Sequence, residues 1–259
     1  MRISIRMIGI ATTVFWVFLI AFAVSAVYSV KDVQFDFGEP QSYLDSDNNM
    51  VFSLPVVIFN RGYYNIGFFN VTTEISDEVG GVISQGTTFI PVIRKGEETT
   101  ILHNITIDVT DLIGENQNFL FNDTDLRMYG AVGMRLAEMI PVQASMNFSM
   151  PWGAPLYGFA LGTPQYSPFN ATHSRVSVPI NFENHAFFDL AGDIQLSMFN
   201  SADQLIGGGQ TAVAAYQNSP YSGIVDIYVL TTGVTASGHF DVSFSSPLFN
   251  CGPWVISYG

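Results

Sequence analysis

The sequence predicts an all-β protein of two tandem antiparallel β-sandwiches preceded by one transmembrane helix. Three observations carry this prediction. A pattern of fifteen residues that begins at Phe52 recurs at Val176, 124 positions further along the chain. Most segments after residue 30 alternate apolar and polar residues with a period of two, which is typical of half-buried strands. A run of 24 uncharged residues, Met7 to Val30, precedes these segments.

The uncharged run predicts a membrane anchor over residues 1–30. As a helix it would span about 36 Å, enough to cross a hydrocarbon core of about 30 Å. Arg2 and Arg6 precede the run and acidic residues follow Lys31, so the positive-inside rule predicts a cytoplasmic N-terminus. The expected location is therefore the cell membrane, single-pass, with the bulk of the chain extracellular.

A cleaved signal peptide is the alternative to an anchor. The residues Val24-Ser-Ala26 resemble a small-residue cleavage site. The apolar run is longer than the usual hydrophobic region of a signal peptide, about 7–15 residues, and this length favours a retained helix.

The repeated pattern predicts two copies of one domain. It contains Pro55 and Asn60 in the first copy, and Pro179 and Asn184 in the second. The likeness continues further along the chain, where Gly81–Gly86 corresponds to Gln204–Gly209. The strand from Ile101 corresponds more loosely to the strand from Ile224. The expected domains are residues 31–151 and 156–259. The segment Met150-Pro-Trp-Gly-Ala-Pro155 between them is expected to be a short, rigid linker, because prolines stiffen the chain.

Individual elements follow from alternation and turn chemistry. Alternating strands are expected at Arg175–Phe182, Ile194–Met198, Phe240–Phe244 and Trp254–Tyr258, with turns at Asp45–Asn49, Gly80–Gly81, Lys95–Gly96, Gly207–Gly209 and Asn218–Pro220. One or two helical turns are expected in Asp108–Asn118. Thr124–Met139 is expected to be a strand, since Gly130 and Gly133 interrupt its helical pattern.

The ends of the two copies also look alike. Met146–Pro151 resembles Val242–Pro247, which suggests that each copy ends similarly. On that alignment the second copy is shorter and lacks a hairpin that the first has near Leu126–Ile140.

Composition excludes some functions. The formal net charge of −13 argues against nucleic acid and against charge-driven binding to anionic lipid headgroups. Cys251 is the single cysteine, so no intrachain disulfide can form. It is interpreted as a small core residue, with a thiol for an intermolecular bond as the alternative.

Five Asn-X-Ser/Thr sequons predict N-glycosylation. In three of them the asparagine falls on the polar phase of its strand, where a sugar could attach without touching the core. The five asparagines are Asn70, Asn104, Asn122, Asn147 and Asn170.

Motifs of metal or catalytic sites are scarce. Asp45, Asp47 and Asn49 copy the first three ligand positions of a calcium loop, but Met50 and Val56 occupy positions that need glycine and glutamate. A plain turn is the preferred interpretation of this segment. His103 falls between Ile101 and Ile105 and is expected to be a buried histidine with hydrogen-bond partners. No catalytic residue, cofactor-binding residue or cofactor is predicted.

The layout resembles the late-embryogenesis-abundant type 2 family, also called the water-stress-and-hypersensitive-response (WHy) domain. The residues that carry the resemblance are Val56–Asn60, Val82–Gly86 and Thr99–Val109 in the first copy, and Ile180–Asn184, Leu205–Gly209 and Gly223–Val229 in the second. The match as a whole covers most of residues 31–259. Both copies depart from the family pattern after the asparagine, where Arg61 and His185 replace proline. The resemblance implies immunoglobulin- or fibronectin-like sandwiches with a role in stress tolerance and no defined catalytic site.

The predicted function is therefore non-enzymatic: a membrane-anchored extracellular protein that acts in cell-surface binding, packing or stress protection. A subunit of a surface assembly or filament joined by strand addition is one alternative. An extracellular carbohydrate binder or enzyme is another. No sequon lies beyond Thr172, so the second domain is expected to keep its faces bare for a partner, either another copy or another surface protein.

Overall fold

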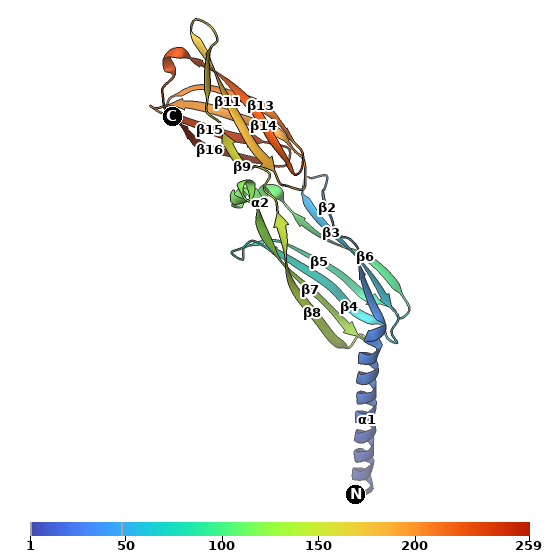
Figure 1. Ribbon diagram of the computed structural model, residues 1–259. Helices are drawn as coiled ribbons and strands as arrows, with labels where there is room; N and C mark the ends of the chain where they lie inside the picture. The colour runs from blue at the N-terminus through green and yellow to red at the C-terminus, as the bar shows by residue number, and fades with distance from the viewer. Residues whose placement is uncertain (1, 48) are drawn as a thin grey trace.

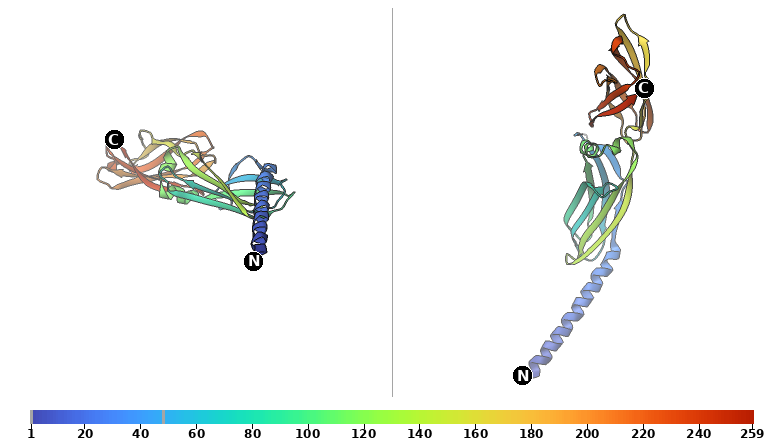
Figure 2. Two further views of the ribbon diagram at one scale, coloured as in Figure 1. Left: turned by 90° about the horizontal axis from the view of Figure 1, so that it is seen from below. Right: turned by 90° about the vertical axis from the view of Figure 1, so that its left-hand side faces the viewer.

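The computed structural model describes residues 2–47 and 49–259. It shows four antiparallel sheets of four strands each, preceded by one long helix, and so confirms the predicted all-β class. Helix α1 (Arg2–Ser29) passes through a single 3-10 turn, η1 (Val30–Asp32), directly into β1 (Val33–Phe37). The sheets form two sandwiches stacked end to end, with α1 at one end of the molecule (Figures 1 and 2). Of the described residues, Thr12–Asp32 form the one helical span that is long and apolar enough to cross a membrane.

The inner sandwich, next to α1, is built from residues 33–152. One sheet places β1 and β2 (Gln41–Leu44) along one edge of β3 (Met50–Asn60) and β6 (Glu98–Ile107) along the other. The second sheet has the order β5 (Val82–Ile93), β4 (Ile66–Ser76), β7 (Thr124–Leu136), β8 (Ile140–Trp152). Between β6 and β7 lie α2 (Val109–Glu115), which forms the helical turns expected in Asp108–Asn118, and α3 (Asn118–Phe121), which was not predicted. The carboxylate of Asp108 caps α2 by accepting from two backbone N–H groups.

The outer sandwich, residues 157–258, repeats this topology. One sheet holds β9 (Tyr157–Leu161), β10 (Gln165–Pro168), β11 (His173–Asn184) and β14 (Ser219–Leu230). The other has the order β13 (Leu205–Ala215), β12 (Leu190–Asn200), β15 (Gly238–Ser245), β16 (Asn250–Tyr258). A 3-10 turn, η2 (Thr231–Gly233), stands where the inner sandwich has α2 and α3.

The duplication extends to strand register. Phe37 pairs with Val56 in the inner sandwich, and Leu161 with Ile180 in the outer one, so both members of the pair are shifted by 124 positions. The backbone N–H of Gly38 donates to the Pro55 carbonyl at 2.9 Å, and the N–H of Gly162 donates to the Pro179 carbonyl at 2.8 Å. The repeated proline therefore marks the same chain crossing in both copies.

The predicted alignment of the two C-terminal segments is wrong. Strand β15 pairs with β12 as β7 pairs with β4, so β15–β16 is the counterpart of the β7–β8 hairpin and no hairpin is missing. Met146–Pro151 lies in β8, whereas Val242–Pro247 begins in β15. The outer sandwich is shorter because η2 replaces two helices and because its hairpin strands are shorter. Alternation is a local property and carries no information about which strand is the partner.

The asparagine within each repeated pattern, Asn60 or Asn184, is a structural clamp. Asn184 is fully buried; its amide donates to the carbonyls of Phe188 at 2.9 Å and Ala215 at 3.1 Å, and its Oδ1 accepts from the Ala186 N–H at 3.0 Å. Asn60 makes the same three bonds, to Tyr64, Ile93 and Gly62. Each clamp ties the turn after its strand to the end of a strand in the facing sheet.

One glycine in the later part of each repeat, Gly86 or Gly209, lets the two sheets approach each other. A Cβ on Gly86 would lie 2.7 Å from the Asn104 carbonyl oxygen of β6, and one on Gly209 would lie still closer to the Asp226 carbonyl oxygen of β14. These glycines close one edge of each sandwich, between β5 and β6 and between β13 and β14.

The larger hydrophobic core is shared by the two sandwiches. It runs from the distal half of the inner sandwich, through α2, α3 and the segment after β8, into the outer sandwich. A smaller cluster fills the half of the inner sandwich near α1; its members are Val56, Ile58, Ile66, Phe69, Val71 and Ile93. The two sandwiches are therefore packed against each other through a common core.

Candidate functional site

The molecule has two joints, and both use the same turn of the repeated domain. The turn between β3 and β4 receives the end of α1, and the turn between β11 and β12 receives the end of the inner sandwich. The Arg61 N–H donates to the Asp32 carbonyl at 3.1 Å, and the His185 N–H donates to the Ala154 carbonyl at 3.0 Å. Proline has no N–H, so the residue that the WHy pattern carries here could not make this bond.

The first joint fixes α1 to the inner sandwich. The Tyr63 N–H donates to the Ser29 hydroxyl at 2.7 Å, and the hydroxyls of Ser25 and Tyr64 are hydrogen-bonded at 2.7 Å. The rings of Phe22 and Tyr64 meet edge to face, with centroids 5.7 Å apart. These contacts cover the last two turns of α1, so the helix meets the sandwich at a packed surface.

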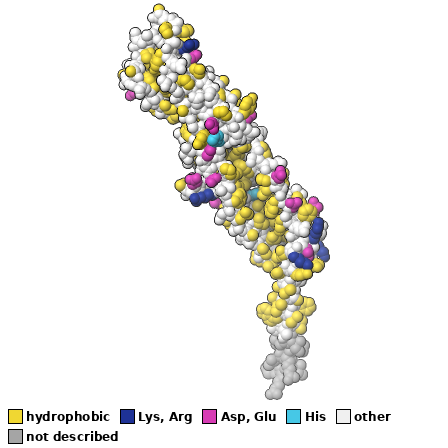
Figure 3. Space-filling view, in the orientation of Figure 1, with side chains coloured by type: hydrophobic (Ala, Val, Ile, Leu, Met, Phe, Trp, Pro, Cys, Tyr) yellow, Lys and Arg dark blue, Asp and Glu magenta, His cyan; other side chains and the backbone are white. Residues whose placement is uncertain are grey.

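The second joint centres on His185. Its Nδ1 lies 2.8 Å from a carboxylate oxygen of Asp123 in the inner sandwich, and its Nε2 lies 3.0 Å from one of Glu183 in the outer sandwich. Both nitrogens can donate only when the ring is protonated. Two hydrogen bonds raise the pKa of His185: the bond to Glu183 has the larger effect and the bond to Asp123 the next. The ring also stacks on Tyr157, with centroids 4.3 Å apart. Figure 3 shows a histidine flanked by acidic side chains at this level of the molecule.

Apolar contacts and backbone bonds complete the second joint. The Trp152 indole N–H donates to the Phe119 carbonyl at 2.8 Å, and the two rings meet edge to face. The Leu156 N–H donates to the Leu120 carbonyl at 2.9 Å. Gly153 lies against the His185 carbonyl so closely that a Cβ there would collide with it. The linker predicted around these residues is thus packed into the joint.

A cavity of about 900 Å³ opens beside this joint. Its walls combine apolar side chains with carboxylates; among them are Met50, Phe52, Met150, Phe187, Glu78, Asp123, Asp125 and Glu183. Within residues 2–47 and 49–259, no group of three or more His, Cys, Asp and Glu side chains is arranged to hold a metal ion.

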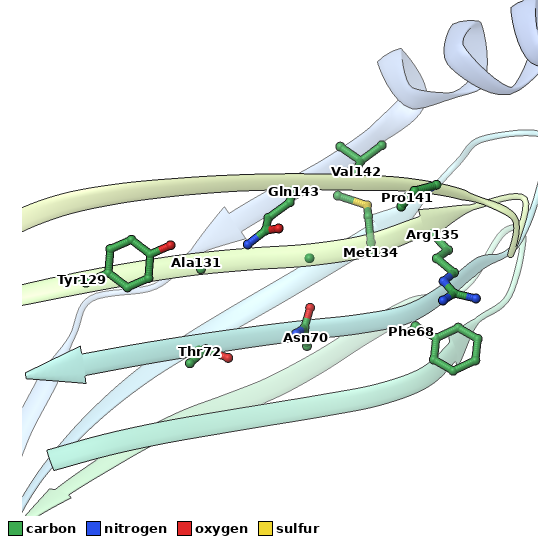
Figure 4. Close-up of a pocket in the computed structure, with 11 residues that line it drawn as sticks. Phe68, Asn70, Thr72, Tyr129, Ala131, Met134, Arg135, Pro141, Val142 and Gln143 are labelled. Carbon is green, nitrogen blue, oxygen red and sulfur yellow. The ribbon is translucent and has the colours of Figure 1, made fainter.

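A shallow depression of about 640 Å³ lies on the outer face of β4, β7 and β8 (Figure 4). Ala131 and Gly133 form its floor, because neither carries a large side chain. Asn70, one of the predicted sequon residues, is half-buried and lies over Gly133. At one end the Arg135 guanidinium lies over the Phe68 ring, 4.6 Å from its centroid.

The other four sequon asparagines are exposed. They lie in four different places: Asn104 on β6, Asn122 after α3, Asn147 on β8 and Asn170 after β10. The Asn170 Oδ1 accepts hydrogen bonds from the backbone N–H groups of Thr172 and His173. All four side chains can be reached from solvent, and their glycosylation stays a prediction.

The calcium-like segment is a turn closed on itself. The Asp45 Oδ1 accepts from the backbone N–H groups of Asp47 and Asn49, both at 2.9 Å, and its Oδ2 accepts from the Asn49 amide at 3.2 Å. Hydrogen bonding from the Asn49 backbone lowers the pKa of Asp45. Asn48, in the middle of this turn, lies outside the described residues. The Asp45 carboxylate therefore accepts hydrogen bonds within its own turn, as the interpretation of this segment as a plain turn expects.

His103 and Cys251 occupy the interior positions expected of them. His103 is buried, with Nδ1 2.9 Å from the Thr88 hydroxyl and Nε2 3.0 Å from the Thr73 hydroxyl; burial lowers its pKa. Cys251 is half-buried against the core, and burial raises its pKa to about 12. The thiol is therefore protonated and unreactive near neutral pH.

The sequence predictions did not include the joint residues Asp123 and Tyr157, and they placed Trp152 only in the linker between the domains. One signal was available: Arg61 and His185 stand at equivalent positions of the two copies, directly after the repeated asparagine, and these are the two joint positions. The partners of His185 on the inner sandwich could not be inferred, because they meet it only through the stacking of the two sandwiches.

No family model and no curated protein matches the chain. Among solved structures, a red sea bream transglutaminase is similar over 88% of this chain and 31% of its own, with 13% identity and a TM-score of 0.33. A glycosyl hydrolase family 2 member from Bacteroides cellulosilyticus DSM 14838 is similar over 81% of this chain and 28% of its own, with 10% identity and a TM-score of 0.34. The chain spans less than a third of either protein, and TM-scores this low give no indication of function.

Proposed function

We propose that the protein is a non-enzymatic, membrane-anchored stalk that holds two WHy-like sandwiches outside the cell in cell-surface binding, packing or stress protection. The observation that carries the proposal is the fixed attachment of an exposed apolar helix to a rigid body. Only 11% of the candidate spanning window of α1 is buried in the structure. Bulky side chains such as Phe15, Trp16 and Phe18 would face water unless lipid covered them.

The first joint also supports retention of α1 over cleavage. Cutting after Ala26 would remove Phe22 and Ser25, which contact Tyr64, and would separate them from the buried Ser29. An extracellular location, the orientation predicted from Arg2 and Arg6, and glycosylation at the exposed sequons belong to the same proposal. The WHy resemblance belongs to the same proposal; the clamp asparagines and edge glycines that carry part of it have matching structural roles in the two copies.

The test of the anchor is direct. Membranes of the native host are washed with alkaline carbonate, and the protein that stays bound is analysed by intact mass spectrometry. We expect it to remain in the membrane pellet with α1 present, and glycosidase treatment to lower its mass. A soluble mature chain that begins at Val27 would overturn the anchor, and an unchanged mass would overturn glycosylation alone.

A second candidate function, assembly by strand addition, is favoured by strand β8. Its pairing with β7 places Val142, Met146 and Phe148 on the face that points toward the other sheet, yet all three are exposed. The equivalent face of β16 is packed in the outer sandwich, where Trp254 and Ile256 lie against the core. An apolar groove of about 220 Å³ runs beside β8; it is lined by Phe35, Phe37, Phe69, Val71, Val132, Met134, Val142 and Ala144.

The occupant proposed for this groove is a strand of a second copy. β8 has thirteen residues, no bulge in its pairing and no charged side chain, so it lacks the charges that usually protect an edge strand. Cross-linking of detergent-extracted protein should show dimers that Met146→Lys abolishes and Gln143→Lys, on the other face of β8, preserves. A strict monomer would reject the assembly, and the partner surface predicted on the outer sandwich would then be tested by pull-down.

A further inference from the structure

At the end of the inner sandwich nearest α1, several turns lie together beside the end of the helix, and we call this surface the collar. The collar comprises residues 28–32, 61–68, 94–97 and 135–139. Asn65 ties its turns together: its Oδ1 accepts from the Lys95 N–H at 3.1 Å and its amide donates to Glu138 at 2.9 Å. The Gly96 N–H donates to the Asn60 carbonyl at 2.7 Å. Three turns far apart in sequence are thereby held at one level beside the end of α1.

The collar concentrates the positive charge of an acidic protein. Five of the nine basic residues of the chain lie in it, with three acidic residues. The sandwiches outside the collar carry two basic and nineteen acidic residues. Figure 3 shows basic side chains gathered at the end of the inner sandwich next to the helix. The five basic residues are Lys31, Arg61, Arg94, Lys95 and Arg135, and all are exposed.

The collar also exposes large apolar and aromatic side chains. Tyr28, Tyr63, Phe68 and Met139 all lie on its surface, and Met139 is 69% exposed. The three cation–π contacts found among the described residues all lie at this end: Lys31 over Tyr28, Arg61 over Phe59 and Arg135 over Phe68. Cations paired with aromatic rings suit a layer where apolar and charged groups meet.

The backbone of Phe68 adds an independent observation. Phe68 has a φ of +53°, in the left-handed region that bulky residues rarely adopt, and the β4–β7 register shifts beside it. Phe69 points into the core, whereas Phe68 is exposed beside Arg135. The chain thus tolerates a strained residue at the place where it presents an aromatic ring at the surface.

We infer that the collar rests in the headgroup layer of the membrane that α1 crosses, where its basic side chains bind lipid phosphates and its aromatic side chains enter the interface. The inference rests on the proposed anchor. Because the first joint fixes the end of α1 to the collar, the collar must lie at the depth where the apolar span ends. Tyr, Lys and Arg are the residue types that anchor proteins at that depth. The net negative charge of the whole chain argues against binding to anionic headgroups. The collar itself carries more basic than acidic residues, so its local charge favours that binding.

Depth-dependent quenching tests the inference on the full-length protein in nanodiscs of phosphatidylcholine with phosphatidylglycerol. An environment-sensitive dye is attached to one of three single variants. Met139→Cys probes the collar, and Val79→Cys, 92% exposed at the opposite end of the same sandwich, is the matched control. Phe18→Cys probes α1. The half-buried native Cys251, whose thiol is protonated near neutral pH, is expected to label poorly, and dye incorporation into the unmodified chain measures that background.

We expect a headgroup-linked quencher to reduce emission at Met139→Cys at least threefold more than at Val79→Cys, and an acyl-chain quencher to reduce emission at Phe18→Cys. Equal, weak quenching at positions 139 and 79 with strong quenching at position 18 would overturn the collar and leave the anchor standing. Absence of quenching at position 18 would overturn the anchor itself.

A charge variant separates phosphate binding from mere proximity. Combining Arg61→Gln, Lys95→Gln and Arg135→Gln should lower the headgroup quenching at Met139→Cys in discs that contain phosphatidylglycerol. The triple substitution of exposed side chains leaves the clamp and joint bonds in place. Quenching that is unaffected by these substitutions, and equal in discs of phosphatidylcholine alone, would contradict the phosphate contacts.

Discussion

Asn60 and Asn184 each satisfy three backbone groups with one amide side chain. The sequence shows an asparagine before a turn in both copies, and a local bond to that turn could be anticipated from the residue type. The long-range partners, Ile93 and Ala215, could not, because they lie on strands of the facing sheet. The sequence thus shows that the asparagine is repeated, but its partners on the facing sheet are known only from the fold.

Replacing Asn184 by alanine should destabilise the outer sandwich by about 3 kcal/mol, because two carbonyls and one N–H would lose their partner in the interior. Asn184→Asp should cost a similar amount, since a carboxylate cannot donate to the two carbonyls. Urea unfolding gives the free energies. Asn181→Ala, at an exposed position of the same strand, should change stability by less than about 0.5 kcal/mol. Equal effects at positions 181 and 184 would contradict the clamp.

His185 should make the stability of the joint depend on pH. The pKa of His185 is higher in the folded than in the unfolded chain, where it is about 6.5. The histidine therefore adds its full stabilisation to the folded state below about pH 6.5, and this stabilisation is lost as the pH rises through the folded pKa. The melting temperature of the native chain minus that of His185→Gln should therefore shrink between pH 6 and pH 8. Burial of His103 acts in the opposite sense, with stability lost as pH falls, and it cancels in this difference. A difference that stays constant across this range would rule out the two-carboxylate bridge.

At the scale of elements, the sequence predicted helical turns in Asp108–Asn118, where α2 forms, and a strand over Thr124–Met139, which the structure ends at Leu136. The turn predicted at Gly207–Gly209 is wrong, because these residues lie inside β13. Alternation and turn chemistry were insufficient to identify β16 as the counterpart of β8. A short stretch of β8 and a stretch of β15 share similar apolar spacing, but the position of a strand in a sheet depends on its partner strand. The one-to-one correspondence of the two sandwiches became visible only through pairing.

Gly209→Ala should destabilise the outer sandwich by about 2 kcal/mol, because its Cβ would meet the Asp226 carbonyl oxygen where β13 approaches β14. Gly114→Ala is the matched control. A Cβ at Gly114 would meet nothing within 4 Å, and α2 should gain up to about 1 kcal/mol in helix propensity. Thermal unfolding of both variants measures the contrast. Stabilisation by both substitutions would show that the sheet edge can open without cost.

At the scale of the whole molecule, one joint geometry is used twice in series. Each sandwich receives the preceding element on the turn after its clamp asparagine, through the N–H of Arg61 or His185. The sequence indicates duplication of a domain. It does not indicate that the attachment is duplicated as well, since Asp32 and Ala154 belong to dissimilar segments. Because both joints are packed, the position of the outer sandwich is expected to follow the orientation of α1.

Gly153→Ala should loosen the outer sandwich from the inner one without unfolding either. Its Cβ would collide with the His185 carbonyl, which is backbone and cannot move aside without opening the joint. Spin labels at Val82→Cys and Leu205→Cys, exposed positions on the inner and outer sandwiches, report the separation by double electron–electron resonance. The native background should give one narrow distance distribution and Gly153→Ala a broad one, with the strand content by circular dichroism unchanged.

Gly130→Ala, whose Cβ would make only ordinary contacts in β7, should keep the distribution narrow. If Gly153→Ala also kept it narrow, the shared core alone would hold the sandwiches together, and the His185 contacts would be dispensable for rigidity.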